Sequence, residues 1–206
     1  MTPRTLAMLL TTAMCSAVAP ATSLAQTSGS LATQADALLR SASESSLDRL
    51  FQSVHGLSRT PEDSARLCRA LASPDRGSAD TWLALAQQIS PGNRDALTGA
   101  LGDVALSGWQ GRPAAFNEEE ARKFLRQAGV RAAILNEGFS VGALTADATI
   151  PGDAEADALR CQSLGWLLDA VASQPQAERA AITRLLLRDG MASLLQSSTA
   201  STPPGT

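Results

Sequence analysis

Apolar positions along this chain recur at intervals of three and four residues, the spacing that places side chains on one face of an α-helix. A first stripe runs from Leu38 to Val54, and Gly56 offers a stop. A later stripe consists of Phe124, Ala128, Ala132, Leu135 and Phe139. Runs that alternate with a period of two, as strands do, are nearly absent. The pattern predicts an all-α fold, a compact helical bundle of about six to eight helices.

Polar residues mark where several of these helices begin. Thr60 precedes Pro61 and two acids, a combination of N-cap, first-position proline and acidic first turn. Ser90 and a following proline repeat this logic. Asn117 stands before three glutamates, whose charges favour the positive end of the helix dipole. Helices are therefore expected to begin directly after Thr60, Ser90 and Asn117.

Two segments that begin with tryptophan resemble each other. WLALAQQISPGNRDALT starts at Trp82 and WLLDAVASQPQAERAAIT starts at Trp166, and they share Trp-Leu, an alanine and a proline without a gap. Each reads as a helix, a turn started by proline and a second helix. The interpretation is two related αα-hairpins stacked in one core. Chance resemblance between helices rich in Ala and Leu stays open as the alternative.

The two ends of the chain differ from its helical middle. Residues 1–25 combine Arg4, a short apolar stretch and small residues at the end, as a cleaved secretory signal peptide does. Residues 26–34 are polar and predict a flexible leader, and residues 196–206 predict a disordered tail. Residues 35–195 remain as a single helical domain, long enough to bury a core.

Charge and hydropathy exclude two classes of partner. Lys and Arg number 17 against 20 Asp and Glu, a net charge of -3, so there is no basic surface for nucleic acid. No second apolar stretch is long enough to cross a bilayer, so no membrane span is expected once the signal is removed. Export to the periplasm and full secretion both stay open, as does the oligomeric state.

The cysteines fit an exported protein. Cys15 lies in the predicted signal peptide, which leaves Cys68 and Cys161. In an oxidising compartment such a pair favours a disulfide, although two buried free thiols are the alternative. Both cysteines lie on apolar helical stripes, and a bridge would close a loop of about 90 residues and stabilise the fold by roughly 4–5 kcal/mol. We predict a structural Cys68–Cys161 disulfide that joins an early helix to a late one.

The segment Gly138–Gly142 reads G-x-S-x-G, the nucleophile elbow of serine hydrolases. That elbow needs a strand before the serine, and an acid and a histidine later in the chain. Here a helical stripe leads into the motif, and the single histidine, His55, precedes Ser140. Such a match arises by chance in roughly one chain in ten of this composition. An exported hydrolase that uses Ser140 and His55 is the weaker alternative, and we assign no catalytic residue.

Motifs for binding metals, phosphates or dinucleotides are incomplete or absent in the sequence. One histidine and two distant cysteines do not make a zinc cluster. Asp153 opens a segment that resembles a calcium loop, but Ala158 and Leu164 stand where glycine and glutamate are required. Phosphate-loop and dinucleotide motifs are absent from the sequence. Neither a metal nor a cofactor is expected.

These observations favour a non-enzymatic protein of the bacterial cell envelope that acts by binding another envelope protein, as inhibitors, immunity proteins, chaperones and adaptors do. Trp109 and Phe116 flank a loop that contains Gly and Pro, and each is either a lid on the core or a contact anchor. The irregular stretch 145–156 is a second candidate contact. A carrier of small molecules or lipids is a further alternative, which predicts a continuous apolar cavity.

Overall fold

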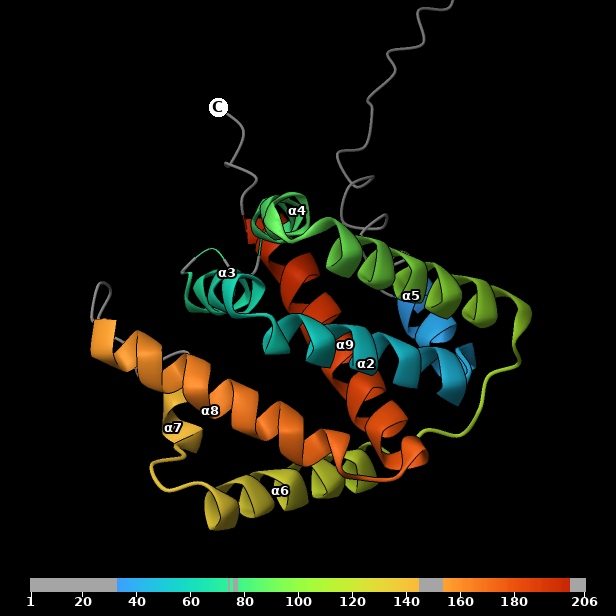
Figure 1. Ribbon diagram of the computed structural model, residues 1–206. Coiled ribbons are helices and arrows are strands. Elements are labelled where there is room, and N and C mark those ends of the chain that lie inside the picture. The colour runs from blue at the N-terminus through green and yellow to red at the C-terminus, as the bar shows by residue number, and fades with distance from the viewer. Residues whose placement is uncertain (1–32, 74, 76–77, 145–153, 201–206) are drawn as a thin grey trace, which may run out of the picture.

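The computed structural model describes residues 33–73, 75, 78–144 and 154–200, in which the chain forms nine helices and no strand (Figure 1). This confirms the all-α class. The helices are one at 33–41 and then α2 (Glu44–Arg59), α3 (Pro61–Ala72), α4 (Ala79–Gln88), α5 (Pro91–Gln110), α6 (Glu118–Leu135), α7 (Val141–Leu144), α8 (Ala154–Ala172) and α9 (Gln176–Ala200). Among the described helices, none combines the length and hydropathy needed to cross a bilayer.

The ends of the chain fall largely outside this description. The predicted signal peptide 1–25 lies outside the described residues, and so does the leader 26–34 up to residue 32. At the other end α9 continues to Ala200, so residues 196–200 of the predicted tail are helical. Residues 201–206 are again outside the described part.

The helix starts that the polar residues predicted are confirmed. Thr60 is the N-cap of α3 and Pro61 its first residue, and Ser90 precedes α5 in the same way. Asn117 is the N-cap of α6, where its side chain accepts a hydrogen bond from the Glu120 N–H at 3.0 Å. The Thr60 and Ser90 side chains make no capping hydrogen bond of this kind, so proline at the first helical position marks those two starts.

The first apolar stripe is not one helix. The helix at 33–41 ends, and Ser43 adopts an extended conformation as the N-cap of α2, with its side chain accepting from the Ser46 N–H. A serine that satisfies a free N–H in this way competes with helix continuation. Gly56 does not stop α2, which continues to Arg59, because a single internal glycine costs a helix only about 1 kcal/mol.

Helix α2 lies at the centre of the domain. Figure 1 shows it crossing α9, with α5 on one side and α6 on the other, and it contacts α3, α5, α8 and α9. Three apolar clusters make up the core, and α2 contributes to each of them: Leu47 and Leu50 to the first, Phe51 to the second and Leu57 to the third. Helices α3, α5, α8 and α9 are therefore joined to one another through α2.

The predicted cysteine pair is present. Cys68 of α3 and Cys161 of α8 lie at disulfide distance, with their Cα atoms 5.4 Å apart. Cys68 is buried, and the loop between the two cysteines spans 93 positions of the sequence. The bond thus joins two helices that pack on each other and on α2.

The two tryptophan segments each form a helix followed by a second helix, namely α4 with α5 and α8 with α9. Their two helices do not, however, pack mainly on one another. Helix α4 packs on α3, α5 on α2, and α9 on α2 and α6. The two segments therefore do not form two αα-hairpins that each pack on themselves, and both second helices pack on α2.

Candidate functional site

Ser140 occupies a structural position. Its hydroxyl accepts a hydrogen bond from the Ala143 N–H at 3.2 Å, which caps the short helix α7. Its own N–H donates to the Ser163 hydroxyl of α8 at 3.2 Å. Helix α6, rather than a strand, precedes the motif, and Gly138 takes a left-handed conformation with φ 88° between α6 and α7. The strand–serine–helix geometry of a nucleophile elbow is therefore absent here.

His55 lies on α2 and contacts α8 away from Ser140. Its Nε2 is 2.8 Å from Asp169 Oδ1, its ring stacks on Phe51, and Arg59 also donates to Asp169. Ser163, the contact of Ser140, stands six positions before Asp169, about 9 Å away along the axis of α8. Within the described residues no hydrogen bond joins Ser140 to His55. A serine nucleophile needs such a bond to its base, so both residues are better explained by their structural contacts.

Trp109 and Phe116 have opposite environments. Trp109, at the end of α5, is 85% exposed and stands on the outer side of that helix. Phe116 is half-buried, and its ring lies 5.7 Å from the guanidinium carbon of Arg184 and 5.3 Å from that of Arg188. Two arginines of α9 thus cover the Phe116 ring, at distances typical of cation–π contacts. Of the two candidate contact residues, Trp109 is the one whose side chain is largely exposed, and Phe116 is partly covered.

The buried Arg184 explains why Phe116 lies there. Its guanidinium donates to the carbonyl of Leu39 at 3.0 Å and to that of Ala42 at 2.7 Å. These carbonyls belong to the end of the helix at 33–41, where a cation is favourable. Arg184 is 7% exposed, so Phe116 shields the hydrogen bonds that attach the N-terminal helix to α9.

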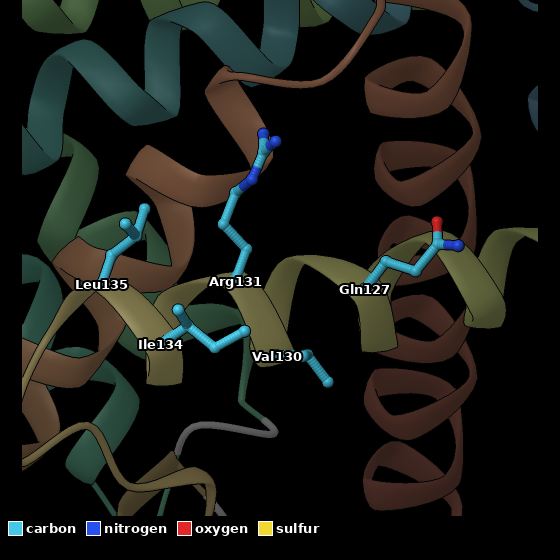
Figure 2. Close-up of a pocket in the computed structure, with 5 residues that line it drawn as sticks. All are labelled: Gln127, Val130, Arg131, Ile134 and Leu135. Carbon is cyan, nitrogen blue, oxygen red and sulfur yellow. The ribbon is translucent and has the colours of Figure 1, made fainter.

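A surface on α6 stands out that the sequence did not single out. Val130, Ile134 and Leu135 are 60%, 77% and 71% exposed. A depression of about 250 Å³ runs between their side chains and those of Gln127 and Arg131, all from this one helix (Figure 2). A second depression of about 370 Å³ shares Gln127 and Arg131 and continues to the turn between α8 and α9. We call Val130, Ile134 and Leu135 with the adjoining depression the α6 surface.

The apolar stripe of α6 in the sequence does not coincide with the α6 surface. The stripe Phe124–Phe139 included Leu135, yet only Ala128 and Ala132 of that stripe are fully buried. Val130, Ala133 and Ile134 stand three and four positions apart on the outer side. Three apolar residues at such spacing, on the side away from the core, were the signal available in the sequence.

The described residues provide no metal-ligand cluster, and the depression on α6 is not an enclosed cavity. In the part of the chain that the structure describes, no three His, Cys, Asp or Glu side chains gather closely enough to hold a metal ion. The candidate contact segment at 145–156 lies outside the described residues up to residue 153, and its last three residues begin α8. The depression on α6 lies along a single helix, unlike the enclosed cavity that a carrier requires.

Comparison with known proteins adds no relative: no protein-family model, no curated protein sequence and no solved structure matches the chain. The geometry of its own residues is therefore the basis for assigning a function.

Proposed function

We propose that this protein is an exported, non-enzymatic helical protein of the bacterial envelope that binds another protein through the α6 surface. One observation carries the proposal. Three large aliphatic side chains of α6 line one depression and are 60–77% exposed. Each would gain about 1.5–3 kcal/mol from full burial, and clustered apolar side chains of this kind commonly mark protein contacts.

The charges beside the α6 surface indicate the chemistry of its partner. Lys123 and Arg126 are exposed on the same side of α6 as Val130 and Ile134, about two turns and one turn before Val130. The surface therefore has a basic half and an apolar half. An amphipathic segment with aliphatic side chains followed by acidic ones would complement both halves.

The same combination of apolar and basic side chains can also bind an anionic membrane. Two features favour a protein instead. Glu119 and Glu120 are exposed at the start of the same helix, and the whole chain carries a net charge of -3. Both would weaken attraction to a negative lipid surface.

The experiment is a comparative capture from envelope extract with three forms of the exported, oxidised protein: wild type, Ile134→Glu and Leu83→Glu. Leu83 is 59% exposed on α4, away from α6, and serves as the matched control. A partner retained by wild type and by the control, but reduced at least tenfold by Ile134→Glu, supports the proposal. A charge reversal, Arg126→Glu, should weaken the same complex.

Two results would sink the proposal. One is capture of the same proteins by all three forms, or enrichment of none. The other is binding to phosphatidylglycerol vesicles that Ile134→Glu abolishes, which would assign the α6 surface to a membrane.

A further inference from the structure

Helix α5 is apolar on both sides. Its inner side packs on α2 through Ala100 and Val104, and on the helix at 33–41 through Gly108. Its outer side is exposed and uncharged over three turns, and consists of Thr98, Leu101, Gly102, Ala105, Leu106 and Trp109. We call these six residues the α5 face. A helix that is apolar all round is normally covered all round, yet Trp109 is 85% and Leu106 56% exposed.

The spacing within the α5 face suits another helix. Thr98, Gly102, Ala105 and Trp109 follow at intervals of four, three and four, as along a coiled-coil seam. The middle of this seam is made of small residues, and the space beside Gly102 is open. A second helix could therefore approach closely at the centre, while the larger side chains close the contact at its ends.

Charges at the two ends of α5 indicate that the second helix is the α5 of another copy of this chain. Asp95 is exposed in the first turns of α5, and Arg112 is exposed just after its last residue. If a second α5 lies antiparallel, each Asp95 meets the Arg112 of the other copy. The same register sets the remaining residues opposite one another as Thr98 with Trp109, Leu101 with Leu106 and Gly102 with Ala105.

This register is self-complementary: large residues meet small or aliphatic ones, and each acid meets a base. A two-fold symmetric interface requires that property, because residue i contacts residue j and j contacts i. We infer that the α5 faces of two copies of this chain pack antiparallel in a symmetric dimer.

The dimer is expected to be reversible. A single helix pair buries less than the 1,200–2,000 Å² or so of a standard stable interface, so the dissociation constant should be on the order of micromolar. Helices α5 and α6 lie on opposite sides of the molecule, with α2 and α9 between them (Figure 1). Dimerisation through α5 therefore leaves both α6 surfaces free, and it requires no other protein.

The first test is sedimentation equilibrium of the purified, oxidised protein as exported, over concentrations that span the micromolar range. We expect a monomer–dimer equilibrium that Leu106→Asp weakens at least tenfold. Leu83→Asp is the matched control, since Leu83 has nearly the same exposure, 59% against 56%, and lies on α4. A protein that stays monomeric, as it would if a different protein covered α5, overturns the inference. A dimer that both variants leave unchanged does so too.

The second test concerns the register. Asp95→Arg and Arg112→Asp should each weaken the dimer severalfold, and the double variant should restore it, because the two charges are only exchanged. In a mixture of Gly102→Cys and Ala105→Cys copies, oxidation should cross-link one variant to the other. A dimer that survives both single charge reversals and forms no such cross-link has another geometry, and the antiparallel α5 interface would then be wrong.

Discussion

The Asp63 carboxylate accepts a hydrogen bond of 2.6 Å from the Ser90 hydroxyl, so a fully buried acid in the first turn of α3 holds the residue that precedes α5. The Ser90 N–H, the Asn93 side chain and Arg66 donate to the same carboxylate. Burial by itself would raise the pKa of Asp63. The hydrogen bonds from Ser90, Asn93 and Arg66 outweigh it and lower the pKa to about 2, from an ordinary 3.8.

Replacing this acid tests its contribution. Asp63→Asn puts an amide NH₂ among groups that are all donors, and we expect the free energy of unfolding at neutral pH to fall by about 2–3 kcal/mol. Urea denaturation measures the change. Glu62→Gln is the control, since the neighbouring Glu62 side chain is 85% exposed, and it should change stability by less than about 1 kcal/mol. Equal effects from both variants would contradict the role of Asp63.

The pH dependence of stability follows from the same carboxylate. Because its folded pKa is depressed, its stabilisation is fully present above the unfolded value of 3.8 and is lost as pH falls toward 2. A shift of this size corresponds to roughly 2 kcal/mol. The stability difference between wild type and Asp63→Asn should therefore shrink between pH 4 and pH 2, as followed by thermal melts. A difference that stays constant over that range would show that Asp63 is not ionised in the fold.

Gly108 and Gly129 differ in the space available for a side chain, so alanine substitutions at the two positions can be compared. A Cβ at Gly108 would lie 2.6 Å from the Leu38 carbonyl oxygen, whereas a Cβ at Gly129 would meet nothing within 4 Å. Gly108→Ala should destabilise the fold by about 1–3 kcal/mol, as overpacking does. Gly129→Ala, inside α6, should stabilise it by about 0.5–1 kcal/mol. Opposite signs in urea denaturation are the expected result, and a stable Gly108→Ala variant would mean that the helix at 33–41 can move away from α5.

Removal of the disulfide should lower the stability of the whole domain. The Cys68→Ala/Cys161→Ala variant is expected to lose about 4–5 kcal/mol, the chain-entropy value for a loop of this length. That is a large part of the 5–15 kcal/mol typical of a whole domain. Reductant should lower the melting temperature of wild type towards that of the variant, and should leave the variant unchanged. If reductant also lowered the melting temperature of the double variant, the effect could not be assigned to the Cys68–Cys161 bond.

The hydrolase alternative has a direct measurement. Ser140 is engaged in capping α7 and has no hydrogen bond to His55, so a fluorophosphonate probe should not label the folded protein. Ser140→Ala should cost about 1 kcal/mol through the lost cap. Labelling of wild type that disappears in Ser140→Ala, but persists in Ser58→Ala, would instead establish a reactive serine.

Features that depend on neighbours within one helical turn could be read from the sequence. The helix starts after Thr60, Ser90 and Asn117 are of this kind, since the first two are marked by a proline at the first helical position and the third by a side-chain cap. The cysteine pair could also be predicted, because the oxidising compartment inferred from the N-terminus left one pairing available.

Features that depend on residues distant in the chain could not be predicted from the sequence. Trp109 and Phe116 look equivalent in the sequence, and only the approach of Arg184 and Arg188 from α9 covers one and not the other. Asp63 reads as an ordinary first-turn acid, and its burial results from the packing of Ser90 and Asn93 against it. The α6 surface was hidden for a related reason, since periodicity identifies an apolar side without saying whether a neighbour covers it.

The central position of α2 has a consequence for how the protein comes apart. Leu47, Phe51 and Leu57 of α2 belong to three different clusters. Opening any one cluster of the described core therefore weakens the packing of α2. Unfolding should therefore be a single all-or-none event, and the α2 amides should exchange with solvent more slowly than those of α4 or α6. A fragment without α2 would lack at least one buried member of each of the three clusters.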